Sequence, residues 1–83
     1  MRAHDNTEAA WQVWQARIAS MTREEADFVR DLRNTKGATW RAVASTCAQE
    51  WAIDWGGSQL IGMDICERAA EIFGEDYRQP PWN

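Results

Sequence analysis

The sequence predicts an all-α fold, a small domain of four helices, on three observations. Apolar residues recur at helical spacing in four segments. Capping residues or glycines stand at the ends of these segments, and 83 residues is the length of one domain. The predicted helices cover about residues 7–20, 23–34, 40–51 and 59–73. Residues 75–83 include two prolines, so we expect an extended tail that completes a single domain over residues 1–83.

The first helix, about residues 7–20, carries a narrow apolar seam. Its members are spaced by three, four and three residues: Trp11, Trp14, Ile18 and Met21. This heptad-like spacing is typical of a helix that packs along one line. Packing on the rest of the domain is the favoured interpretation, and a dimer seam is the alternative.

The second helix, about residues 23–34, begins with a capping box. Thr22 and Glu25 stand three residues apart, where each side chain satisfies a backbone donor beside the other. Three apolar residues form its inward face: Ala26, Val29 and Leu32. Gly37 is placed to end this segment, because glycine adopts left-handed backbone angles without strain.

The third helix, about residues 40–51, has the most regular pattern in the chain. With Thr39 as its cap, it follows the template of one helical face without a miss: Trp40, Val43, Ala44, Cys47, Ala48 and Trp51. The paired glycines Gly56 and Gly57 then allow a sharp change of direction.

The fourth helix, about residues 59–73, is capped by Ser58 and ended by Gly74. At about 100° per residue, its apolar side chains sweep an arc of about 200°. The narrower polar stripe holds three acids and one base: Asp64, Glu67, Glu71 and Arg68. Such a wide apolar arc exceeds what one neighbour covers, so this helix is either the centre of the domain or one side of an oligomer interface.

Charge and cysteine content narrow the setting. The net charge is −4, yet residues 30–41 hold four basic side chains against one acid, and residues 50–76 hold seven acids against one base. This polarity predicts charge-steered contacts. Cys47 and Cys66 are expected to be buried thiols in a reduced state, with a disulfide as the alternative if the third and fourth helices meet there. No stretch is apolar enough to span a membrane, and the N-terminus lacks the apolar core of a signal peptide, so we expect a cytoplasmic protein.

Part of the chain resembles helix-turn-helix DNA-binding domains of the resolvase-like and homeodomain-like kind. The resemblance is carried by a glycine, a hydroxyl residue, an aromatic, an arginine and two small apolar residues: Gly37, Thr39, Trp40, Arg41, Val43 and Ala44. It implies a helix-turn-helix-like arrangement over about residues 21–73, with residues 58–73 as the recognition helix and Ala44 small where that helix crosses. The acidic stripe on residues 58–73 opposes the phosphate contacts that such a helix would make.

Catalysis has few groups to use. The single histidine, His4, lies near the N-terminus, and neither a zinc-spaced cluster nor a phosphate-binding glycine loop is present. Asp64, Glu67 and Glu71 have a spacing that suits a divalent cation, but a solvated helix face is the favoured interpretation. We therefore expect no enzyme activity, no cofactor and no metal site.

These observations predict a small protein-interaction module, an accessory, adaptor or regulatory subunit that binds a protein partner or its own copy. The candidate partner-binding residues are two tryptophans outside the helical stripes and the acidic set of the last helix: Trp55, Trp82, Asp64, Glu67 and Glu71. The alternative is a DNA-binding regulator that contacts phosphates through a basic corner formed by Arg30, Arg33, Lys36 and Arg41. A ligand pocket lined by Trp40, Trp51 and Trp55 is a third interpretation, without polar groups to support it.

Overall fold

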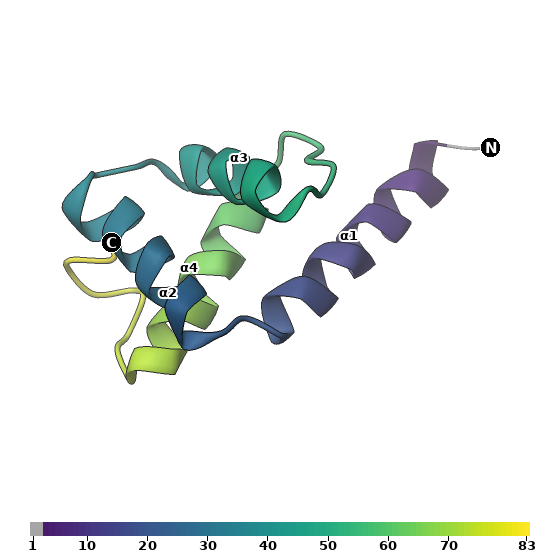
Figure 1. The fold of residues 1–83 in the computed structure, drawn as a ribbon. Coiled ribbons are helices and arrows are strands. Elements are labelled where there is room, and N and C mark those ends of the chain that lie inside the picture. Colours follow the sequence, from purple (N-terminus) through teal and green to yellow (C-terminus); the bar gives the residue numbers. More distant parts are fainter. Residues whose placement is uncertain (1–2) are drawn as a thin grey trace.

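The computed structural model describes residues 3–83, with side chains from residue 9 onward. Four α-helices follow one another along the chain, and a π-helical turn, η1, continues the second: α1 (Ala3–Ala19), α2 (Arg23–Arg30), η1 (Asp31–Thr35), α3 (Trp40–Trp51) and α4 (Gln59–Phe73). Residues 3–83 contain no strand, and the predicted all-α fold is confirmed. Figure 1 shows α2 and α3 on α4, while α1 leans against this group and its N-terminal half projects beyond it. That projection gives the molecule an elongated outline, 41 by 22 by 21 Å.

Helix α4 is the central element. It packs against α1, α2 and α3, so its wide apolar arc is covered within the chain. The residues buried along it are mostly small: Ile61, Gly62, Ile65, Cys66, Ala69 and Ala70. Of the two roles expected for this helix, the structure assigns the one at the centre of the domain.

The closest approach between helices lies at Gly62. A Cβ added there would overlap the carbonyl oxygen and carbon of Trp40 and lie 3.1 Å from its Cα. The backbones of α3 and α4 therefore touch at this point, and only a residue without a side chain fits. Ala44, one turn further along α3, is also fully buried.

Most of the helix ends follow the local sequence. Both hydrogen bonds of the Thr22–Glu25 capping box are present, and the side chains of Thr39 and Ser58 accept from backbone amides at the starts of α3 and α4. Gly74 ends α4 in the left-handed region, at φ 71°. The second segment ends differently from the expected plain helix, because Lys36 donates its amide to the carbonyl of Asp31, five residues earlier, and widens the last turn.

The seam of α1 packs on its own domain. Trp14 is only 1% exposed, and its indole nitrogen donates to the carbonyl of Asp54 at 3.0 Å. Its ring lies 6.2 Å from that of Trp51, centroid to centroid. Met21 is buried as well. Two of the four seam residues, Trp14 and Met21, are therefore packed inside the domain, in line with the favoured interpretation of the seam. Helix α1 also begins at Ala3, earlier than expected.

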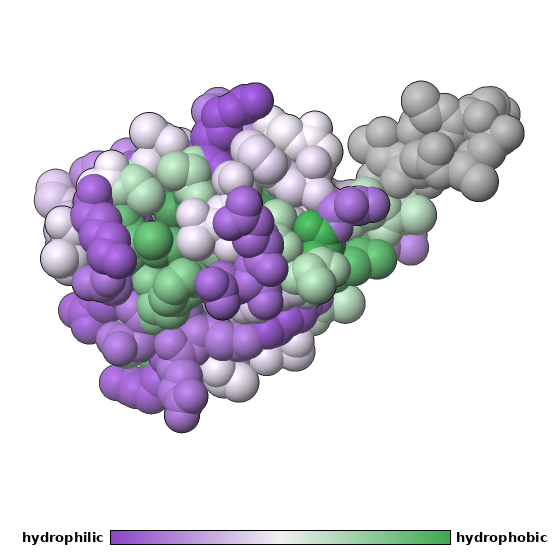
Figure 2. Space-filling model, turned by 45° about the horizontal axis from the view of Figure 1, so that its top comes forward, coloured by the Kyte–Doolittle hydropathy of each residue, from purple (hydrophilic) through white to green (hydrophobic). Residues whose placement is uncertain are grey.

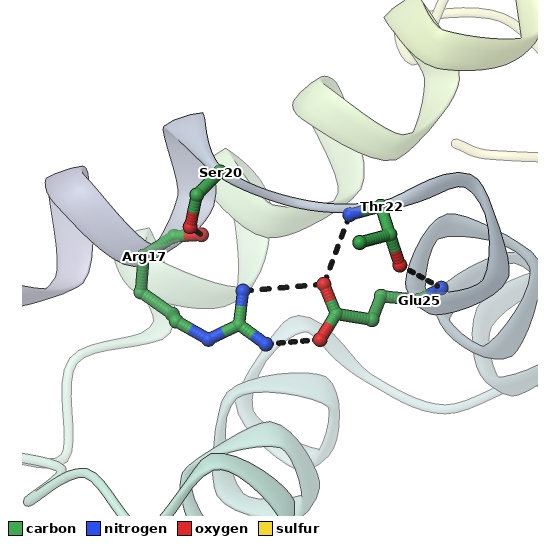
Figure 3. Close-up of polar contacts among 4 residues, drawn as sticks. All are labelled: Arg17, Ser20, Thr22 and Glu25. Carbon is green, nitrogen blue, oxygen red and sulfur yellow. Dashed lines mark hydrogen bonds and ion pairs between the residues drawn. The ribbon is translucent and has the colours of Figure 1, made fainter.

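An arginine–glutamate pair joins α1 to α2. The Arg17 guanidinium donates two hydrogen bonds to the Glu25 carboxylate, which also accepts the Thr22 amide at 2.9 Å (Figure 3). Arg17 in turn lies 4.3 Å above the ring of Trp51. The hydrogen bonds from Arg17 lower the pKa of Glu25 below its ordinary value of 4.5.

We expect the Glu25→Gln variant to lose about 1 kcal/mol of stability at neutral pH, the usual worth of a partly exposed ion pair combined with a cap. Because the pKa of Glu25 is lower in the folded chain, its contribution is present above about pH 4.5 and disappears as the pH falls through the folded-state pKa. Urea unfolding from pH 7 to pH 3 should therefore show the variant and the parent converging in acid. The exposed neighbour Glu24→Gln is the control, and a gap that stays constant with pH would contradict the assignment.

The C-terminal tail is not extended, as its prolines suggested. Hydrogen-bonded turns link Gln79 to Asp76 and Trp82 to Gln79, and they fold the tail back onto the domain. Trp82 is 1% exposed and its indole nitrogen donates to Glu75 at 2.8 Å. The tail is therefore a part of the core, with Trp82 as its anchor.

Cys47 and Cys66 lie fully buried on α3 and α4 and are free thiols, as the apolar helix positions predict. Across the described residues, none of the helices combines the length and the apolar character that crossing a membrane requires.

Candidate protein-interaction surface

Two grooves flank α1 on the surface. The first, which we call the apolar groove, has a volume of about 750 Å³ and lies between α1 and the loop after α3. It is lined by Ala9, Ala10, Val13, Ala52, Ile53, Asp54, Trp55 and Gly56. Val13 is 52% exposed, and Figure 2 shows hydrophobic side chains gathered where α1 leaves the body of the molecule. Among the residues with described side chains, Asp54 is the one charged residue in the lining.

Trp55 is held in a fixed position in this groove. Its indole nitrogen donates to the carbonyl of Ser58 at 3.2 Å, and the Arg41 guanidinium lies 5.4 Å from its ring centre. The same guanidinium donates to the carbonyl of Gly57 at 3.1 Å. The tryptophan is therefore half-buried and ordered before any partner arrives.

The second groove, which we call the acidic groove, lies on the other flank of α1, against α4. Its volume is about 320 Å³, and its lining is Gln15, Ile18, Ala19, Asp64, Glu67, Arg68 and Glu71. Arg68 lies 3.5 Å from Glu71 and neutralises it in part. Burial raises the pKa of Asp64, because the surrounding residues of the domain exclude water from its carboxylate. The three acidic residues predicted for partner binding are thus brought together along one groove.

Trp82, the fifth residue predicted for partner binding, does not belong to this surface. It is buried in the core by the folded tail, and its carbonyl accepts from Arg33 Nε at 2.7 Å. A side chain in this position is part of the domain and unavailable to a partner, so the structure corrects the prediction for Trp82.

The four basic residues of the predicted corner are engaged inside the fold. Arg30 pairs with Glu75 and lies 4.7 Å from the ring centre of Phe73. Arg33 donates to the carbonyls of Ala38 and Trp82 and stacks 3.6 Å above Trp40. Arg41 holds the loop at Gly57 and Trp55, as described above. Lys36 is 65% exposed and pairs with Asp31 at 3.6 Å on the surface. Each basic residue of the corner therefore contacts a different part of its own chain. These contacts weaken the case for a phosphate-binding patch.

The groups expected for catalysis or metal binding give no site among the described residues. Burial raises the pKa of Cys47 and of Cys66 to about 12, which keeps both thiols protonated. In this part of the chain, no three His, Cys, Asp or Glu side chains come together in a way that could hold a metal ion. His4 lies outside the side chains that the structure describes. Trp40 and Trp51 are covered by Arg33 and Arg17, so they do not share a pocket with Trp55.

Comparison of the chain with protein-family models, with curated proteins and with solved structures gives no match in any of the three. The two grooves and the charges around them are therefore the features of this chain that bear on its function.

The sequence did not indicate the three residues that α1 contributes to the apolar groove: Ala9, Ala10 and Val13. They lie off the Trp14 seam of α1, and their pattern alone resembles an ordinary solvent-facing side of a helix. Val13, on the same side of α1 as the two alanines, was the one available signal. It indicates a groove only because the loop after α3 forms the other wall.

Proposed function

We propose that this chain is a small non-catalytic protein-interaction module, an accessory, adaptor or regulatory subunit that binds another protein chain through the surface around α1. The observation that carries the proposal is the apolar groove, which exposes Val13 beside an ordered, half-buried tryptophan, Trp55. Tryptophans with one apolar face accessible are enriched among the residues that dominate binding energy at interfaces.

The groove suits binding because its tryptophan loses little conformational freedom when a partner binds. Trp55 is already held by Ser58 and Arg41, so its immobilisation does not oppose association. In the part of α1 with described side chains, Val13 is exposed on the wall of the groove, and a bound chain would cover it.

The two cysteines also fit a binding role without catalysis. Cys47 and Cys66 have pKa values raised to about 12, the opposite of an activated nucleophile. We also propose a cytoplasmic setting, where free thiols of this kind remain reduced.

The test is a pull-down of the tagged chain from an extract of its source cells, with Val13→Asp compared with Leu60→Asp. Both residues are exposed apolar side chains, 52% and 56%, but only Val13 lines the groove. We expect Val13→Asp to lose the captured protein and Leu60→Asp to retain it. Light scattering on the purified chain detects a second copy as the occupant. A monomer that captures no protein in a Val13-dependent manner would count against the proposed function.

A further inference from the structure

The basic side chains of residues 9–83 all make contacts within their own chain. In the part of the chain with described side chains, each contacts a carboxylate, a backbone carbonyl or an aromatic ring of the same chain: Arg17, Arg23, Arg30, Arg33, Lys36, Arg41, Arg68 and Arg78. Residues 9–83 therefore contain no cluster of unpaired basic side chains.

Many of the carboxylates are not paired in this way. Six carboxylates of residues 9–83 form no ion pair with a basic side chain of the same range: Glu24, Asp27, Glu50, Asp54, Asp64 and Glu67. Three of these six, Asp54, Asp64 and Glu67, line the two grooves beside α1. The surplus negative charge of the chain is therefore concentrated in part around the surface that the proposed function uses.

From Ala9 to Ala19, the outer face of α1 between the two grooves is narrow and uncharged. Ala9, Gln12, Ala16 and Ala19 are exposed and recur at helical spacing along it. Alanines at a helix surface let the backbone of another helix approach closely. A second helix packed on this face would have one groove on each side of it.

We propose that the occupant of this surface is a basic amphipathic helix of another protein, which lies across α1 with apolar side chains in the apolar groove and lysine or arginine side chains toward Asp64 and Glu67. The inference rests on the proposed function and names the chemistry of its partner. Charge complementarity is its main support, because the grooves offer carboxylates that lack cations and an apolar wall beside them.

The same charges disfavour the other occupants. A second copy of this chain brings a further net charge of −4 and basic side chains that its own fold already holds. A nucleic acid brings phosphates to a surface lined by carboxylates. The raised pKa of Asp64 agrees with a partly dehydrated carboxylate that an incoming cation would stabilise.

The experiment titrates the full chain with a synthetic helical peptide of leucine and lysine and follows backbone and indole resonances by NMR. The matched peptide has glutamate in place of every lysine. We expect the lysine peptide to shift the resonances of Val13, Trp55 and Asp64, and to bind about tenfold more weakly to the Asp64→Asn/Glu67→Gln double variant.

The control is the Glu24→Gln/Asp27→Asn double variant, which removes the same charge from two unpaired carboxylates on α2, outside both grooves. We expect its affinity to stay within about twofold of the parent, as for charges screened by distance. Equal weakening by both double variants would mean unspecific charge attraction and would overturn the inference.

Other outcomes separate the inference from the proposed function. If the glutamate peptide binds in a Val13-dependent manner, or if a Val13-dependent dimer forms, the groove is an interaction site but its occupant is not a basic helix. If the lysine peptide does not bind, the inference is overturned, and the pull-down with Val13→Asp still decides the proposed function by itself.

Discussion

The Gly62→Ala variant is expected to lose about 3 kcal/mol or more of stability, at the upper end of what overpacking costs in a core. The added methyl group would occupy the space of the Trp40 carbonyl group. A backbone atom does not rotate away as a flexible side chain does, so α3 and α4 have to separate. Separation loosens the packing of the central helix against its main neighbour, and a domain of this size has only a few kcal/mol in reserve.

Thermal unfolding followed by circular dichroism measures this effect. For a domain of 60–100 residues, 3 kcal/mol corresponds to a fall in Tm of roughly 12–24 °C. Gly56→Ala is the matched control, because an added Cβ there meets nothing within 4 Å. A Gly62→Ala variant with the Tm of the control would mean that the two helices do not touch at this point.

Replacing Trp82 by alanine is expected to cost about 3–5 kcal/mol, the usual effect of removing a fully buried tryptophan. The side chain is 1% exposed, so its loss leaves a cavity where the tail meets the domain. The hydrogen bond from its indole to Glu75 is lost too. Arg33 keeps its acceptor, since it binds the backbone carbonyl of residue 82.

Trp82→Phe separates the two contributions. It retains most of the apolar volume and loses the indole donor, so we expect a cost of about 1–2 kcal/mol, of which an unmade hydrogen bond is a large share. Asn83→Ala, at the exposed end of the same tail, should leave the urea midpoint unchanged. A Trp82→Ala variant as stable as the parent, but deficient in partner capture, would restore Trp82 to the interaction surface.

The sequence of this protein was sufficient for most of the features that depend on neighbours along the chain. The four helices lie close to their predicted ranges because their apolar spacing and end residues act over a few positions. The Thr22–Glu25 capping box, Ser58 and Gly74 show this directly. The burial of Cys47 and Cys66 also followed from their places on apolar helix faces.

Of the candidate site, the sequence indicated Trp55 and the acidic residues of α4, but not their surroundings. Val13 became a groove residue only because the loop after α3 lies beside α1. Arg33 was assigned to a phosphate-binding corner, whereas its guanidinium bridges two carbonyls that are distant along the chain or lie beyond a turn. A charged side chain looks the same in a sequence whether it faces water or its own backbone.

The tertiary structure alone decided how the segments meet. The local patterns predicted a wide apolar arc on α4 without saying what covers it, an extended tail, and a seam on α1 that suited either its own domain or a dimer. The contact of Gly62 with Trp40, the burial of Trp82 and the packing of Trp14 on Trp51 resolved all three. The physical reason is the range of the forces: hydrogen bonding and capping within a helix act over about four residues, whereas packing joins surfaces far apart in the chain and depends on the shapes that all of them present.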